Sequence, residues 1–210
     1  MTPAAEKGLA ILRDYSNFEW YIIPILLIVL HIYASEVGKK NWHIVFAGLA
    51  LFGMDFFNEI WNALIFHFTQ YAPVWGAPGE TCYLVMIGWN VEIIFMFLVM
   101  GVAAAKTLPE DKNMKIFGLP NRIVIAVANT IACVFVECLL NAMGALTWDY
   151  PLWSIKFPFI LFLIGYLPFF LVCFWVHDME TNRQRAITVG SIYGFNFLCV
   201  IIFGGILGWL

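Results

Sequence analysis

The sequence has little charge, and this excludes most soluble folds. Only 12% of the 210 residues are charged and 62% are hydrophobic, against roughly 25% and roughly 45–50% in an average soluble domain. A soluble globular fold is therefore excluded. The formal net charge is −3, and no basic run is interleaved with aromatic residues. Nucleic acid is consequently not expected as a partner.

Several motifs that identify functional classes are also missing. The five cysteines occur singly in apolar runs without a CxxC or CxxH pattern, which argues against a disulfide framework or a zinc site. No glycine-rich phosphate loop or Gly-x-Ser-x-Gly nucleophile turn is present. No apolar stretch contains an interior lysine for a retinal Schiff base. The histidines are too dispersed to predict a haem held at one depth; they are His31, His43, His67 and His177.

Long apolar runs are the main feature that the sequence does have. A bilayer core of about 30 Å needs ~20 mostly apolar residues per helix. Six stretches qualify, namely 19–35, 44–68, 83–105, 123–146, 157–176 and 187–210. They predict an all-α integral membrane protein with one domain, 1–210, built as a bundle of about six transmembrane helices. Residues 1–16 mix apolar and charged side chains, which predicts an interfacial segment, or a seventh helix if this segment is counted.

The distribution of lysine and arginine predicts the orientation of the chain. Basic residues gather in the connections between stretches one and two, three and four, and five and six. Because cytoplasmic loops are enriched in Lys and Arg, these connections should face the cytoplasm. Both termini should then lie on the non-cytoplasmic side. Aromatic residues in the opposite connections fit an interfacial belt there; they are Tyr71, Trp75, Trp148, Tyr150 and Trp153.

Polar side chains recur inside three of the apolar stretches. Asp55, Glu59 and Asn62 are spaced i, i+4, i+7, so they share one face of a helix, with Asn58 beside them. The third stretch carries Glu92, one turn after Trp89. The fourth has polar or thiol side chains at successive i+4 steps, Asn129, Cys133, Glu137 and Asn141.

These acids predict a shared cavity within the membrane. A charge at the bilayer centre costs roughly 2.5–3.5 kcal/mol, so each acid needs a partner, a proton or a water-filled space. The inferred topology places Glu59, Glu92 and Glu137 in the central-to-outer half of their helices. No intramembrane Lys or Arg can neutralise them, and mutual repulsion implies that some are protonated. A protonated carboxyl in an aromatic-lined pocket can act as a general acid.

Two other interpretations of the polar residues remain open. Asn, Asp and Glu can join helices by hydrogen bonds that contribute about 0.6–2 kcal/mol each. The carboxylates and His67 could also hold a dinuclear metal centre, a minority alternative, because the Glu-x-x-His pairs of helical di-iron proteins are absent. The sequence therefore predicts no cofactor and no metal at these acids.

A short internal repeat links the second and fourth stretches. Glu59 and Trp75 are sixteen residues apart, as are Glu137 and Trp153. In each segment an asparagine follows the glutamate and a tyrosine precedes the tryptophan. Repeated units of this kind occur in many membrane proteins.

The segment Asp55-Phe-Phe-Asn58-Glu59-Ile-Trp61-Asn62 resembles the polar, tryptophan-bearing helix of the small membrane-bound terpene cyclases of the fungal meroterpenoid type. The resemblance implies a compact multi-helix protein in which an embedded acid protonates an epoxide or alkene of a polyprenyl substrate. It assigns the acid role to Glu59. In that family the tryptophan directly precedes the acid, and a second acid comes from the C-terminal helix, so here Glu92 or Glu137 would supply the second carboxyl.

These observations together predict an intramembrane enzyme that performs acid catalysis on an apolar lipid or isoprenoid. The predicted catalytic residues are Glu59, Glu137, Glu92 and Asp55, and the predicted substrate-binding residues are Asn58, Asn62, Trp61, Trp89 and Asn141. A small proton-coupled transporter is an alternative, because mid-membrane carboxyls also bind protons or cationic solutes. An accessory subunit whose polar stripes dock on a partner's helices is a third possibility.

Overall fold

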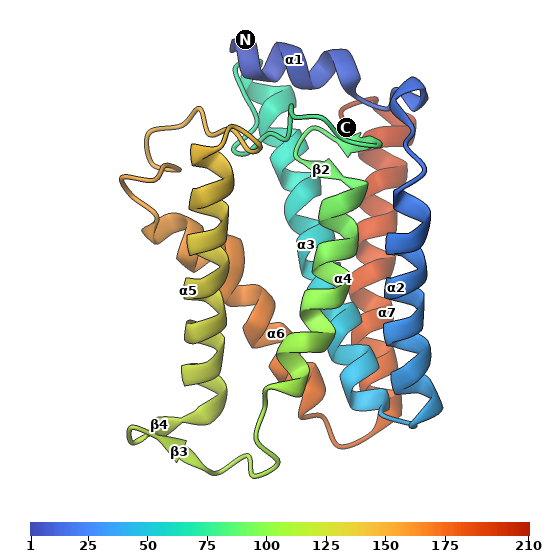
Figure 1. The fold of residues 1–210 in the computed structure, drawn as a ribbon, viewed down its shortest axis with the longest axis vertical. Helices are drawn as coiled ribbons and strands as arrows, with labels where there is room; N and C mark the ends of the chain where they lie inside the picture. Colours follow the sequence, from blue (N-terminus) through green and yellow to red (C-terminus); the bar gives the residue numbers. More distant parts are fainter.

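A computed structural model describes all residues from 1 to 210 (Figure 1). The elements are α1 (Pro3–Ile11), η1 (Tyr15–Asn17), α2 (Ile22–Gly38), α3 (Trp42–Thr69), β1 (Leu84–Met86), β2 (Trp89–Asn90), α4 (Val91–Lys106), β3 (Lys115–Ile116), β4 (Leu119–Pro120), α5 (Asn121–Ala142), η2 (Leu161–Tyr166), α6 (Leu167–His177), α7 (Asn182–Cys199) and η3 (Val200–Ile206). The helices α2 to α7 run along the long axis of the molecule, and α1 lies across one end (Figure 1).

Each of the six apolar stretches contains a helix, so the structure is mostly helical, with two short β-hairpins. Three helices are long and apolar enough to cross a membrane: Trp42–Thr69, Asn121–Ala142, and Asn182–Ile206 where α7 continues into η3. The helices Ile22–Gly38 and Leu161–His177 are apolar but shorter.

Helix α3 occupies the centre of the bundle. In its most apolar window 67% of the residues are buried, compared with 22% for α5 and 17% for α7. It packs against α2, α4, α6 and α7. The contact with α4 is close because Gly48 and Gly101 face each other, and a Cβ on Gly101 would lie 2.7 Å from the Gly48 carbonyl oxygen. Small residues of this kind let two helices approach closely.

The third stretch differs from its prediction. The helix begins at Val91, eight residues later than expected, because the preceding residues form a β-hairpin of β1 and β2. Asn90 ends the hairpin and caps the helix, since its side-chain oxygen accepts a hydrogen bond from the Ile93 amide at 2.8 Å. Trp89 therefore lies on a strand, and Glu92 lies in the first turn of α4 rather than near the middle of a helix.

Three other helix limits also differ from their predictions. Helix α5 ends at Ala142, and Gly144 follows with a φ of +77°, a left-handed conformation that glycine adopts easily. The fifth stretch becomes helical at Phe159 and then passes through a π-helical segment, η2, before α6. The sixth helix starts earlier than expected, at Asn182, because Thr181 and Gln184 form a capping box.

The N-terminal helix α1 lies across one end of the helix bundle. Helix α1 crosses the end of the bundle near the top of α3 (Figure 1), and its buried face packs Ala5 against a cluster that includes Phe66 and Ile87. Thr2 caps the helix and also donates a hydrogen bond from its hydroxyl to Asp149 Oδ2 at 2.8 Å. Segment α1 thereby covers the loops above the helices.

The opposite end of the molecule carries the basic connections. There Arg122 fixes the N-terminal end of α5, which is called its foot below. The Arg122 guanidinium donates two hydrogen bonds to Asp178, at 2.8 and 2.9 Å. Burial by itself would raise the pKa of the Asp178 carboxyl, but the hydrogen bonds from Arg122 and His177 outweigh burial and hold this pKa below its usual value. Asp178 is therefore ionised at neutral pH, and the ion pair ties α5 to the end of α6.

Candidate functional site

A cavity of about 790 Å³ lies between α3, α4, α5 and the η2–α6 segment, below the loops of the α1 end. Of its 29 lining residues 20 are hydrophobic, and the charged ones are all acidic: Asp55, Glu59, Glu92 and Glu137. No lysine, arginine or histidine lines it. The four predicted acids therefore share one largely apolar space.

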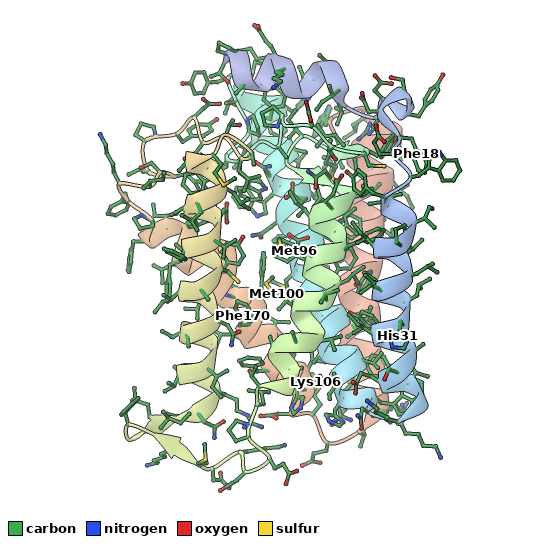
Figure 2. The ribbon with its side chains drawn as sticks, in the orientation of Figure 1. Phe18, His31, Met96, Met100, Lys106 and Phe170 are labelled. Carbon is green, nitrogen blue, oxygen red and sulfur yellow. The ribbon has the colours of Figure 1, made fainter.

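Exposed apolar side chains of α4 and α5 flank the cavity. Helix α5 packs against α6 and η2, while α4 packs against α2 and α3, and the cavity occupies the space between them. Figure 2 shows Met96 and Met100 of α4 beside this space. Met96 and Val136 line it from α4 and α5 and are 42% and 48% exposed. A molecule dissolved in the bilayer could reach the cavity from this side.

Asp55 and Glu59 lie one turn apart on α3 and are each 3% exposed. Each is held by the indole of a tryptophan from the loops above α3. Trp89 Nε1 donates to Asp55 Oδ2 at 2.8 Å, and Trp75 Nε1 donates to Glu59 Oε1 at 2.6 Å. The second oxygen of Glu59, Oε2, is buried and has no hydrogen-bond partner. Buried polar atoms normally have partners, so this oxygen is available to a proton or a ligand.

Glu137 completes a group of three carboxyls. It projects from α5, is 6% exposed, and lies within electrostatic range of both Asp55 and Glu59. Tyr166, at the end of η2, is the hydroxyl side chain beside it. No cation lines the cavity, so the three carboxyls would repel one another if all were ionised.

Glu92 lines the same cavity but has separate partners. Its carboxylate accepts hydrogen bonds from the Thr81 hydroxyl at 2.6 Å, from the Cys82 amide at 2.9 Å and from the Tyr21 hydroxyl. Three donors on one carboxylate favour its charged form and fix it in place. Glu92 thus joins α4, the loop before β1 and the start of α2.

The predicted substrate-binding residues have different positions. Asn58 lines the cavity, and its Oδ1 accepts a hydrogen bond from Trp61 Nε1 at 2.8 Å. Trp61, Asn62, Trp89 and Asn141 do not line it. They form the layer behind its wall, where Trp61 packs edge-on against Trp75 with ring centroids 5.0 Å apart.

Asn62 and Asn141 each fix the loop that follows their helix. Asn62 is fully buried; it donates to the Trp75 carbonyl at 2.8 Å and accepts from the Val74 amide at 2.7 Å. Asn141 donates to the Leu146 carbonyl at 3.1 Å. The asparagines of the repeated segments therefore share a role, which is to place the tryptophan-bearing loops above the acids.

The two repeated segments pack against each other as the roof of the cavity. Trp75 and Trp153 stack with centroids 5.2 Å apart, and Tyr71 and Tyr150 meet edge to face at 5.6 Å. The backbones pair at Gly76 and Thr147. Trp153 Nε1, which lines the cavity wall, and Trp148 Nε1 are buried without hydrogen-bond partners.

No three His, Cys, Asp or Glu side chains converge as a ready-made metal site. The three carboxyls are thus near enough to influence one another but are not arranged as a coordination sphere.

The model for a family described as "Uncharacterized membrane protein family" matches residues 2–205. The chain belongs to this family.

This chain is similar in sequence to two proteins of Archaeoglobus fulgidus, each named only "Uncharacterized protein". One is 55% identical to this chain over 209 residues, which is 100% of this chain and 99% of the relative. The other is 57% identical over 53 residues, or 25% of this chain and 95% of that shorter protein. No solved structure matches the chain with statistical significance.

The outer surface of this membrane protein family member is apolar where a bilayer would meet it. Large hydrophobic side chains on α5 and α7 are exposed, among them Ile131 at 57%, Phe135 at 63%, Phe197 at 55% and Leu198 at 53%. Exposed apolar surface of this extent is unusual for a soluble monomer. The polar groups are instead collected around the cavity.

Tyr166 is the main site residue that the sequence analysis missed. It is 8% exposed, lines the cavity and lies beside Glu137. It is the one hydroxyl-bearing side chain in the stretch 157–176. A single polar group in an otherwise apolar stretch could have indicated a site residue. Met100, which also lines the cavity and whose sulfur lies 3.3 Å from that of Cys133, had no signal because it resembles any other apolar residue of its helix.

Proposed function

We propose that this protein is an intramembrane enzyme that uses its buried carboxyl groups for acid catalysis on an apolar lipid or isoprenoid. We further propose that its six helices cross the bilayer with both termini on the non-cytoplasmic side. One observation supports the proposal: three carboxyls, Asp55, Glu59 and Glu137, line one largely apolar cavity that no basic side chain lines.

Glu59 is the proton donor in this proposal. Its Oε1 is engaged by Trp75, so the unpartnered Oε2 is the atom that can carry a proton to the substrate. A protonated carboxyl at this position also relieves the repulsion among the three acids. Proton addition to an alkene or an epoxide leaves a cationic carbon, and loss of a proton from a neighbouring carbon then gives an isomer of the substrate.

Glu137 is the proposed base that accepts the second proton, and Asp55 is the neighbouring carboxyl on α3. The Tyr166 hydroxyl is placed to hold the Glu137 carboxyl in position. Aromatic rings can stabilise a cationic intermediate through their faces, by about 0.5–2 kcal/mol for each ring. The cavity supplies several such rings, from Trp75, Phe97, Trp153, Tyr166 and Phe169.

The cavity composition favours a neutral reacting group over an anionic one. Four acids and no basic side chain line the cavity, so a phosphate or carboxylate would be repelled. A proton-coupled transporter would need the polar path to continue across the membrane. The acids are confined to α3, α4 and α5, which fits a one-sided pocket better than a through-path.

The test compares Glu59→Gln and Glu137→Gln with wild-type protein in mild detergent. The probes are a neutral linear polyprenyl alcohol and its terminal epoxide, and the products are analysed by gas chromatography and mass spectrometry. We expect wild type to form an isomer of unchanged mass, and each variant to lose at least 100-fold in rate. Glu80→Gln, an exposed acid outside the cavity, is the matched control and should keep full activity.

Turnover that is unchanged in both cavity variants would overturn the proposal. Native mass spectrometry of the same preparations provides a second measurement. A co-purified apolar lipid that is present in wild type and lost from both variants supports the cavity as its binding place. Proton flux in proteoliposomes without any product would instead favour the transporter.

A further inference from the structure

The acids that line the large cavity have no cationic partner in the protein. This space, called the carboxyl cavity below, is lined by Asp55, Glu59, Glu92 and Glu137 and by no lysine, arginine or histidine. Buried charges in proteins are normally paired with a charge of opposite sign. A ligand that enters the carboxyl cavity is therefore the available source of a positive charge.

One oxygen of Glu59 marks the place where such a ligand can bind. Glu59 lines the cavity and is 3% exposed. Its Oε1 accepts a hydrogen bond from Trp75 Nε1 at 2.6 Å, whereas its Oε2 is buried without a partner. Buried polar atoms normally have hydrogen-bond partners, and a carboxylate oxygen is an acceptor. An N–H donor inside the cavity would satisfy this oxygen.

Aromatic rings form much of the cavity wall beside the acids. Trp75 stacks on Trp153 with ring centroids 5.2 Å apart, and both line the cavity. Phe97 and Phe169 line it from the other side of Tyr166, with ring centroids 6.1 and 5.9 Å from that of the tyrosine. The face of an aromatic ring attracts an organic cation, and ammonium sites combine several such rings. Rings beside carboxylates are thus suited to an ammonium group.

A metal ion fits these acids less well than an organic cation does. No three His, Cys, Asp or Glu side chains converge in the structure, so an ion would not find the several ligands that it needs. An ammonium group needs no coordination sphere, because a charge-assisted hydrogen bond, nearby charges and ring faces can hold it. The arrangement therefore favours an amine.

The rest of the cavity wall is apolar and suits a hydrocarbon chain. Of the 29 lining residues 20 are hydrophobic, among them Met96 and Met100 of α4 (Figure 2) and Ala132 and Val136 of α5. The volume of about 790 Å³ lies within the range of about 300–1,000 Å³ that is usual for pockets of small organic ligands. Methionine side chains are flexible and adapt to ligands of different shape. The cavity thus combines an acidic, aromatic part with an apolar part.

We propose that the carboxyl cavity binds an amphiphilic amine, which is a protonated amine that carries one long hydrocarbon chain. The ammonium N–H donates to Glu59 Oε2, and the carboxyls of Asp55 and Glu137 add their attraction. The hydrocarbon chain lies against the apolar side chains of α4 and α5. A lipid with a phosphate in its head group is excluded, because the acids would repel it. Binding needs no turnover, so this inference goes beyond the proposed function and is tested separately from it.

The experiment uses the complete chain in mild detergent at pH 7, with N,N-dimethyldodecylamine as the probe. An alkyl amine is protonated at this pH, as the lysine side chain is. Affinity is measured from the rise in the thermal unfolding midpoint with amine concentration, and bound amine is counted by native mass spectrometry. We expect one amine per chain, bound at least tenfold more tightly than 1-dodecanol, which has the same chain without the charge. N,N-dimethylbutylamine should bind at least 100-fold more weakly than the probe, because most of the apolar contact is lost.

Variants of the cavity wall test the two kinds of contact. Glu59→Gln and Glu137→Gln should each weaken amine binding by at least tenfold but bind 1-dodecanol as wild type does, which distinguishes a lost charge from a lost fold. Trp153→Leu, which removes a ring face, should weaken amine binding by about 2- to 30-fold. Glu80→Gln and Trp209→Leu change an acid and a tryptophan outside the cavity. These two controls should bind the amine as wild type does.

Two results would overturn the proposal. One is equal affinity of wild type for the amine and for 1-dodecanol. The other is amine binding that Glu59→Gln and Glu137→Gln both leave unchanged, since the amine would then bind elsewhere. Amine binding without turnover of the polyprenyl probes would support this inference and contradict the proposed reaction, whereas turnover without amine binding would do the reverse.

Discussion

Gly88 shows how closely the roof of the cavity is packed against α3. A Cβ atom at this position would lie 2.6 Å from Asn62 Nδ2 and 2.6 Å from Trp75 Cδ1. Both neighbours are fixed, because Asn62 is hydrogen-bonded to the loop and Trp75 donates to Glu59. A methyl group here would therefore push apart the side chains that position the acid.

The Gly88→Ala variant tests this packing. We expect the free energy of unfolding to fall by about 1–3 kcal/mol, the usual cost of overpacking, measured by chemical unfolding in detergent. Gly190→Ala is the control, because nothing lies within 4 Å of a Cβ built at this helical position. It should be neutral or stabilise by up to about 1 kcal/mol. Equal destabilisation by both substitutions would contradict the packing argument.

The sequence predicted the acids much better than it predicted their partners. The i, i+4 spacing of Asp55 and Glu59 places both on one face of any helix, so their proximity followed from helix geometry. The indoles that bind them come from 16 and 34 residues away in the chain. Which indole meets which carboxyl depends on how the loops fold back, and no local pattern encodes that.

At the scale of elements, the error in the third stretch has a physical cause. The segment 83–90 is as apolar as a buried helix, and hydropathy alone cannot separate it from the α4 that follows. The observed hairpin is stabilised by tertiary contacts: Leu84 is fully buried beneath α1, and Arg13 donates from its backbone to the Leu84 carbonyl at 2.9 Å. The capping residue Asn90 was the local signal for the later start.

Helix α5 is the wall of the cavity with the least support from the rest of the bundle. It packs against α6 and η2, and its side-chain contact with α4 includes Cys133 and Met100, whose sulfur atoms lie 3.3 Å apart. At its N-terminal end it is also held by the pair Arg122–Asp178. The side chains of this pair are only 14% and 22% exposed, so the pair is worth more than a surface ion pair.

The Asp178→Asn variant tests the foot of α5. Loss of a largely buried, charged hydrogen-bond pair costs about 1.5–3 kcal/mol, so amide exchange in the first turns of α5 should become about 10- to 100-fold faster. Amides in the centre of α3 should be unaffected. Glu180→Gln, an exposed neighbouring acid, is the control and should leave exchange unchanged. Equal exchange in α5 of the two variants would mean that the pair does not hold this helix.

At the scale of the whole molecule, the fold places the cavity acids and most of the basic residues in different parts of the structure. The carboxyl cavity lies among the helices nearer the α1 end, and a smaller pocket, lined by His43 and His177 among others, lies at the basic end. Eight of the 11 basic residues lie in the connections at that basic end or in the helix turns next to them, namely Lys39, Lys40, Lys106, Lys112, Lys115, Arg122, Arg183 and Arg185. The excess of basic residues in these connections could be predicted from the sequence. The sizes of the cavities could not, because they depend on how the helices pack.

This charge asymmetry gives a prediction for the orientation in the membrane. Cytoplasmic loops are enriched in Lys and Arg, so the basic end should face the cytoplasm and α1 the opposite side. In a bacterial host, alkaline phosphatase fused after Leu210 should be active, because that enzyme folds only outside the cytoplasm. A green fluorescent protein inserted after Asn113, in the connection between α4 and β3, should fluoresce.

Replacing Lys112 and Lys115 by Gln is expected to weaken the preference for this orientation, since each removed cation lowers the charge bias that fixes the topology. An inactive phosphatase together with a dark insertion at Asn113 would mean that the chain inserts the other way, with the carboxyl cavity nearer the cytoplasm.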